Sequence, residues 1–498
     1  MQHHLHARQA PLDIAPERFR SAGHVLIDRL ADLLAGMRER RVTAGRSVSE
    51  IRQLMGASAG LPSDGTDLES LLSDMTDLLT RYSLYNGHPK FLGYVTSSPA
   101  PVGMLADLLA AAVNPNVGAW TLSPVATEIE AQTVRWIAEL LSYPTTCSGL
   151  LVSGGNVANF VGLYTALRSV FPRKSGECTP ERVSRATVYA SRETHTWLEK
   201  ALDMFGFPPD ALRSLSADSS GRLELEDLKR HLAADMRNGR IPVAVVGNAG
   251  TVSTGAIDPL PAMVGICAHH KVWFHVDGAY GGFAAMLDSA PADIRGLAQA
   301  DSVAVDPHKW LYSPLEAGCA LVRDPEKHRA AYSYHPSYYH FGEEATNFFD
   351  YGPQNSRGFR ALKVWMGLKQ VGRRGYQRML GDDIALAREL SDRLAADADF
   401  QVYTCNLSIV TFRYVPEEYR GRPDDSAAEE YLNQLNQALQ ARLEVGGELF
   451  VSNAVLEGRY LLRACIVNFR TSATDIAELP GIISRYGRQV HEELKQPA

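Results

Sequence analysis

Closely spaced cysteines are missing from this sequence of 498 residues. The chain has six cysteines, but they are scattered, and no two of them form a C-x-x-C pair. This spacing argues against a disulfide framework and against a zinc ribbon. We therefore predict a reducing compartment, the cytoplasm, and no metal site.

Long basic runs and long apolar runs are absent as well. The longest basic run is RERR at residues 38–41 and the formal net charge is -7, so we expect no nucleic-acid partner. No apolar stretch approaches the roughly 18 uncharged residues that a membrane-spanning helix needs. Residues 1–13 lack the apolar segment of a secretory signal, so we expect neither secretion nor a membrane partner.

The remaining composition is that of a large globular protein, with 45% hydrophobic and 21% charged residues. Helical apolar spacing at residues 18–40 and 67–83 predicts a helical N-terminal segment over residues 1–100. Across residues 101–385, short β-branched runs alternate with helical patterns, which indicates βα units and a mostly parallel sheet. Later β runs and a helix predict a small α+β domain over residues 386–498.

The β runs of the predicted sheet end in residues that carry chemistry. In an open α/β sheet, ligands bind at the carboxyl ends of the strands. The run GLLV is followed by the small residues 153–156 just before a helix, and ATVYAS is followed by His195. WFHV leads into Asp277, and SVAV leads into DPHK, which places Lys309 at a strand end. We expect these groups to meet at one edge of the sheet.

Together these groups match the needs of an aldehyde cofactor. A lysine can form a Schiff base when its surroundings favour the neutral amine. A plain Asp277–Lys309 salt bridge is the simpler alternative, but it needs neither the histidine nor small residues before a helix N-terminus. Pyridoxal phosphate uses all four features: an amine, a carboxylate for its ring nitrogen, a flat partner for its ring, and donors for its phosphate. The sequence therefore predicts pyridoxal 5'-phosphate bound to Lys309.

Longer motifs resemble a known family. HVDGAYGG at residues 275–282 and DPHKWL at residues 306–311, with HPKFLGYVTSS, SGGNVAN and SRGFRALKVW, are similar to the group II pyridoxal-phosphate decarboxylases. That family includes the aromatic-L-amino-acid, histidine and glutamate decarboxylases. The resemblance implies the α/β, aspartate-aminotransferase-like architecture called fold type I. It also implies a homodimer with shared active sites, in which residues 1–100 form a dimerisation segment.

The resemblance further implies roles around the cofactor ring. Lys309 matches the lysine that binds the cofactor aldehyde, and Asp277 matches the aspartate on the pyridine nitrogen. Ala279 matches the small residue under the ring, and His195 matches the histidine stacked over it. Tyr338 matches the loop tyrosine that returns a proton to the substrate Cα, so it joins Lys309, Asp277 and His195 as a predicted catalytic residue.

A second set of matched positions is implied to hold the rest of the cofactor. Gly154, Gly155 and Asn156 match the phosphate-binding turn. His308 matches a residue that contacts the cofactor region, and Thr251 is a weaker candidate for such a contact.

The resemblance is weakest at the substrate pocket. Tyr94 and Ser97 match a substrate-lining loop, which would act together with His195 and Tyr338, and Tyr339 is the fallback for Tyr338. Relatives with phenylalanine at the Tyr338 position tend to form aldehydes, so the tyrosine favours the simple amine product.

The predicted reaction is therefore decarboxylation of an L-amino acid, preferably aromatic, to its amine and CO₂. The alternatives are an aldehyde-forming reaction or a glutamate, aspartate, histidine or diaminobutyrate type of substrate. An aminotransferase or lyase of the same fold and a non-catalytic binding protein also stay open.

Asp306 stands where relatives commonly carry asparagine, and we expect its carboxylate to point away from the phosphate turn.

Overall fold

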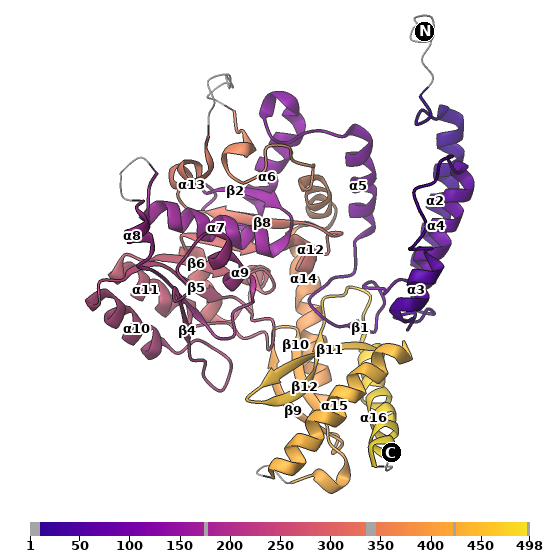
Figure 1. Cartoon of the computed structure of the whole chain (residues 1–498). Helices are drawn as coiled ribbons and strands as arrows, with labels where there is room; N and C mark the ends of the chain where they lie inside the picture. Colours follow the sequence, from indigo (N-terminus) through magenta and orange to yellow (C-terminus); the bar gives the residue numbers. More distant parts are fainter. Residues whose placement is uncertain (1–9, 174–177, 335–344, 422–424, 496–498) are drawn as a thin grey trace, which may run out of the picture.

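The computed structural model describes residues 10–173, 178–334, 345–421 and 425–495, so Tyr338 and Tyr339 lie outside the described residues. The N-terminal segment is helical, as predicted. It holds α2 (Pro16–Ala35), α3 (Val48–Leu54) and α4 (Leu68–Tyr82). It also contributes a short strand that the sequence did not indicate, β1 (Phe91–Leu92). Figure 1 shows α2 and α4 side by side along one flank of the molecule.

The large domain is built on a seven-stranded sheet. Its strands are β2 (Ser148–Val152), β3 (Ala186–Ser191), β4 (Leu212–Leu215), β5 (Ile241–Asn248), β6 (Trp273–Asp277), β7 (Ser302–Val305) and β8 (Gly318–Val322). They lie in the order β2-β8-β7-β6-β5-β3-β4, and only β8 runs antiparallel to its neighbours in this sheet. The predicted mostly parallel sheet is thus confirmed, with β4 as an edge strand that the sequence pattern did not indicate.

Helices cover both faces of this sheet, because the strands are apolar on both sides. Val245 of β5 packs into one apolar cluster and the next residue, Val246, packs into another. The α-helices of this domain are α5 (Pro101–Val113), α6 (Pro124–Leu140), α7 (Gly154–Val170), α8 (Pro180–Val183), α9 (Trp197–Met204), α10 (Leu225–Arg237), α11 (Leu260–His270), α12 (Pro307–Trp310) and α13 (Pro325–Tyr332). Short 3₁₀ helices are η1 (Trp120–Leu122), η2 (Gly282–Met286), η3 (Ala292–Gln299) and η4 (Phe348–Asp350).

The small domain is α+β, as predicted. It contains β9 (Phe400–Asn406), β10 (Ile409–Tyr414), η5 (Glu417–Tyr419), α15 (Ser426–Gly446), β11 (Phe450–Leu456), β12 (Arg459–Cys465) and α16 (Ala473–Lys495). Its sheet has the order β1-β11-β12-β10-β9, in which β1 pairs in parallel with β11. The N-terminal segment is therefore tied to the far end of the chain through backbone hydrogen bonds.

One long helix, α14 (Ala361–Ala395), joins the large and small domains (Figure 1). It bends at Gly372, whose φ is +68°. Leu380 belongs to the apolar cluster of the large domain, whereas Leu390 and Leu394 belong to that of the small domain. None of the helices in the described part of the chain combines the length and apolar character that a membrane crossing requires.

Candidate active site

Ten of the predicted site residues meet in one cavity at the carboxyl ends of the large-domain strands. The cavity has a volume of about 620 Å³, and the small domain closes one side of it with Ser452, Asn453 and Arg463. The predicted residues that line it are Tyr94, Gly154, Gly155, Asn156, His195, Thr251, Asp277, Ala279, His308 and Lys309. The expectation that these residues meet at one edge of the sheet agrees with this cavity, and their roles stay predictions.

Lys309 lies on the one-turn helix α12, directly after β7. Its Nζ atom is 2.9 Å from Asp306 Oδ2, and Asp306 is only 1% exposed. The expectation that Asp306 points away from the phosphate turn is wrong, because a β-carbon built on Gly155 would lie 2.7 Å from the same oxygen. Asp306 points inward because it pairs with the lysine amine, and its other oxygen, Oδ1, is buried and has no hydrogen-bond partner within the described parts of the chain.

Asp277 ends β6 and presents its carboxylate to the same cavity. Its Oδ1 atom accepts the backbone N–H of Ala279 at 3.1 Å, and its Oδ2 atom accepts the indole N–H of Trp197 at 2.7 Å. A carboxylate oxygen can accept two hydrogen bonds, so each Asp277 oxygen can still accept one from a ligand. The fixed carboxylate suits a protonated ring nitrogen.

His195 stands just before α9 and is held as a neutral imidazole. Its Nδ1 atom accepts the backbone N–H of Trp197 at 3.1 Å, so the neutral ring carries its proton on Nε2. Burial lowers the pKa of His195, which favours this neutral form. The preceding Thr194 is fixed by Asn248, whose amide donates to the threonine hydroxyl at 3.0 Å.

The turn between β2 and α7 forms a cradle that only small residues fit. Gly154 has a φ of +79°, a conformation that favours glycine. A β-carbon on Gly155 would lie 2.7 Å from Asp306 Oδ2 and 3.1 Å from the β-carbon of Ala279. The first turn of α7 begins here and carries backbone N–H groups without helical partners, which suits a phosphate. The residues present therefore fit pyridoxal phosphate: Lys309 for its aldehyde and this turn for its phosphate.

The remaining predicted residues differ in how close they come to the cavity. His308 is held by its ring, whose Nδ1 atom is 2.8 Å from the Ala317 carbonyl oxygen. Ser97 lies behind it, because the serine hydroxyl donates to the His308 carbonyl at 2.7 Å and Ser97 is outside the cavity lining. A contact between Ser97 and substrate therefore stays a prediction. Tyr94 lines the mouth, with its ring centroid 5.8 Å from that of Phe450.

Arg463 is a site residue that the sequence reasoning missed. It lies on β12, lines the cavity, and is only 4% exposed. Its Nη1 atom donates to the carbonyl oxygen of Val252, but its buried Nε atom has no partner among the described residues. Burial lowers the pKa of Arg463, because a buried cation is costly without an anion. The signal was available, since an arginine interrupts the apolar run YLLRACIV.

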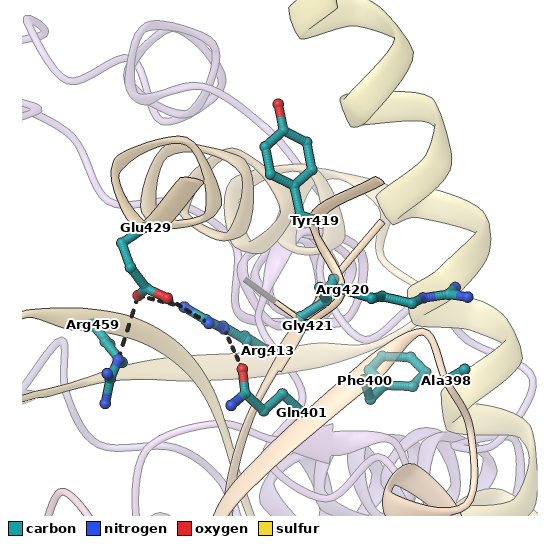
Figure 2. Close-up of a pocket in the computed structure, with 10 residues that line it drawn as sticks. Ala398, Phe400, Gln401, Arg413, Tyr419, Arg420, Gly421, Glu429 and Arg459 are labelled. Atoms are coloured by element: carbon teal, nitrogen blue, oxygen red, sulfur yellow. Dashed lines mark hydrogen bonds and ion pairs between the residues drawn. The ribbon is translucent and has the colours of Figure 1, made fainter. Parts of the chain in front are cut away.

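A second cavity, of about 390 Å³, lies in the small domain (Figure 2). Three of its charged side chains pair with one another: both oxygens of Glu429 accept from Arg413 at 2.8 Å, and Arg459 Nε lies 3.4 Å from Glu429. Arg413 also donates to Gln401 at 3.0 Å. These pairs join β9, β10, α15 and β12 within the small domain, and the dashed lines of Figure 2 mark them.

Comparisons with known proteins agree with this geometry. Residues 51–415 match the family model described as the pyridoxal-dependent decarboxylase conserved domain. The chain is 30% identical over 473 residues to an aromatic-L-amino-acid decarboxylase of Bacillus atrophaeus, covering 94% of this chain and 95% of the relative. It is 28% identical over 466 residues to a phenylacetaldehyde synthase of Petunia hybrida, covering 91% and 90%.

The fold is also that of a solved relative. The crystal structure of Oryza sativa TDC with PLP and tryptamine superposes with a TM-score of 0.89 at 26% identity, covering 97% of this chain and 99% of that chain. The architecture is therefore fold type I, as predicted. On the family match and the fold together, this chain belongs to the pyridoxal-dependent decarboxylases, enzymes that use pyridoxal phosphate to remove CO₂ from amino acids.

Proposed function

We propose that this protein decarboxylates an aromatic L-amino acid to its amine and CO₂. The observation that carries the proposal is the meeting of Lys309, Asp277 and the cradle at Gly155 in one cavity. Pyridoxal phosphate supplies an aldehyde that binds amines and a ring that accepts the electron pair left by departing CO₂. In this proposal Lys309 would hold the aldehyde, and Asp277 would pair with the ring nitrogen. His195 would bind against the ring, with its Nε2–H available for a hydrogen bond.

Arg463 gives a physical reason to favour a substrate without an acidic side chain. Every amino acid brings an α-carboxylate, and an anion beside the guanidinium of Arg463, which lines the cavity, would offset the cost of burying this cation. Among the described lining residues, Lys309 is the other lysine or arginine, and it is assigned to the cofactor. An acidic side chain would need a further cation. The ring of Tyr94, which lines the cavity and leans on the buried Phe450, supports an aromatic side chain instead.

The names of the relatives bear on the same question. The Bacillus atrophaeus relative is an aromatic-L-amino-acid decarboxylase, and the rice structure contains tryptamine. The Petunia hybrida relative is a phenylacetaldehyde synthase, which favours aldehyde formation as the second candidate. We place the amine first because Tyr338 stands where aldehyde-forming relatives tend to carry phenylalanine.

The experiment measures CO₂ release from each of the twenty amino acids by the cofactor-loaded enzyme and identifies the organic product. Release from tryptophan, tyrosine or dihydroxyphenylalanine with the matching amine supports the proposal. Release from glutamate or aspartate contradicts the substrate assignment, and an aldehyde with ammonia contradicts the product assignment. Lys309→Ala should abolish release, whereas Lys327→Ala, which removes an exposed lysine paired with Asp324, should keep it.

The proposed active unit is a homodimer with shared active sites. Exposed apolar side chains on α2, α4 and α5 support it: Phe19 is 62% exposed, Leu79 65% and Val113 67%. Such faces usually mark protein contacts. Sedimentation should give twice the chain mass for the wild type. Leu79→Asp should weaken the dimer, whereas Leu61→Asp, at a loop position that is already 96% exposed, should not.

The free thiols of the six cysteines support the cytoplasm as the location, because such thiols persist in a reducing compartment.

A further inference from the structure

A buried tryptophan holds the carboxylate of Asp277 from behind. Trp197 begins α9, two residues after His195, and is 1% exposed. Its indole N–H donates to Asp277 Oδ2 at 2.7 Å, while the Ala279 backbone N–H donates to Oδ1 at 3.1 Å. Both of these donors are uncharged. They fix the plane of the carboxylate without neutralising it.

The layer behind this pair is uncharged as well. His275 is fully buried, with Nε2 at 2.8 Å from Asn159 Oδ1 and Nδ1 at 2.8 Å from Ser302 Oγ. Burial lowers the pKa of His275 to about 4, so this ring is neutral near pH 7. The Trp197 ring lies edge-on against it, with centroids 5.8 Å apart. No protonated imidazole therefore stands behind Asp277 to compete for its negative charge.

This arrangement matters because the charge of Asp277 has to act on the cavity side. A cation on the buried side would pair with the carboxylate and weaken its pull on a protonated ring nitrogen. A neutral donor orients the same carboxylate through a charge-assisted hydrogen bond and leaves its charge in place. We propose that Trp197 is a positioning residue that fixes Asp277 as an oriented anion for the cofactor ring. This inference rests on the proposed pairing of Asp277 with that ring.

The test compares two tryptophans that each donate one indole hydrogen bond. Trp197→Phe removes the donor to Asp277 and keeps an apolar ring. The control, Trp365→Phe, removes a donor at 2.7 Å from Gln132 Oε1, outside the cavity. The Kd for pyridoxal phosphate is measured on each apoenzyme by absorbance titration. We expect Trp197→Phe to weaken binding about 10- to 100-fold, as for loss of one hydrogen bond to a charged group, and Trp365→Phe to stay within about twofold of the wild type.

A double-mutant cycle separates positioning from general packing. In the Asp277→Asn background, Trp197→Phe should change the Kd less than about threefold, because the carboxylate on which the tryptophan acts is gone. Equal losses in both backgrounds would overturn the inference, as would a wild-type Kd for folded Trp197→Phe. A wild-type Kd for Asp277→Asn would instead overturn the proposed role of Asp277 and leave Trp197 nothing to position.

If thermal unfolding shows that Trp197→Phe does not fold, a measurement on the unmodified Trp197 still tests the inference. The six tryptophans give six indole N–H signals in a ¹⁵N spectrum of the apoenzyme. Asp277→Asn should move one of these signals upfield, and the same signal should respond when cofactor is added to the wild type. Unchanged indole signals in Asp277→Asn would overturn the inference.

Discussion

Gly155→Ala should weaken cofactor binding through a single added methyl group. The new β-carbon would lie 2.7 Å from Asp306 Oδ2, about 0.7 Å closer than the 3.4 Å at which ordinary contacts begin. It would also lie 3.1 Å from the Ala279 β-carbon, so neither side of the cradle leaves room. Moving Asp306 disturbs its 2.9 Å contact with Lys309. Overpacking of this kind costs about 1–3 kcal/mol, which corresponds to roughly 5- to 150-fold in Kd if it is felt mainly in the bound state.

The assay is an absorbance titration of apoenzyme with pyridoxal phosphate, accompanied by thermal unfolding. Gly265→Ala is the matched control, because it lies within α11 and its β-carbon would meet nothing within 4 Å. That variant should bind cofactor as the wild type does and gain up to about 1 kcal/mol of stability from helix propensity. A wild-type Kd for folded Gly155→Ala would refute the assignment of this turn as the phosphate cradle.

Three further predictions concern other buried charges and the substrate. Glu130→Gln removes the anion that pairs with the buried guanidinium of Arg357. The free energy of unfolding, measured in urea, should fall by about 3–5 kcal/mol, and the double variant with Arg357→Met should recover part of this loss. Burial lowers the pKa of His328 from 6.5 to about 3, so the neutral ring stabilises the fold fully above pH 6.5 and this stabilisation is lost as the pH falls toward 3. The difference in unfolding free energy between wild type and His328→Asn should therefore narrow from pH 7 to pH 5, by at most about 1.4 kcal/mol per pH unit. A difference that does not change with pH would contradict this. Arg463→Met should lower kcat/KM for the amino acid about 10- to 100-fold. The affinity for the amine product, which has no carboxylate, should stay nearly unchanged. If the variant lost amine affinity by the same factor, the contact between Arg463 and the carboxylate would be contradicted.

Local sequence patterns located most of the large-domain site because they report strand ends. A β-branched run that stops at Asp277 or before Lys309 places that residue at the sheet edge, whatever the rest of the chain does. The same patterns did not reveal β1, which has two residues and exists through its pairing with β11. Nor did they reveal that α14 continues past Gly372 into the small domain, because a glycine is a common signal for the end of a helix.

Side-chain direction is the part that sequence patterns could not supply. Asp306 was expected to avoid a phosphate, but its nearest partner is the amine of Lys309, and that ion pair decides its orientation. Trp197 and Arg463 reach the site from a helix start and from a distant strand, which are contacts between segments far apart in the chain. Periodicity describes which face of an element is buried and carries no information about which distant residue meets it.

The residue to which the cofactor is attached is the most direct test of the role proposed for Lys309. The loaded enzyme is reduced with borohydride, digested, and its peptides are sequenced by mass spectrometry. We predict a pyridoxyl phosphate adduct on Lys309 and its loss in Lys309→Ala but not in Lys327→Ala. An adduct on another lysine, or no adduct on the loaded wild-type enzyme, would contradict the assignment of Lys309 as the residue that binds the cofactor.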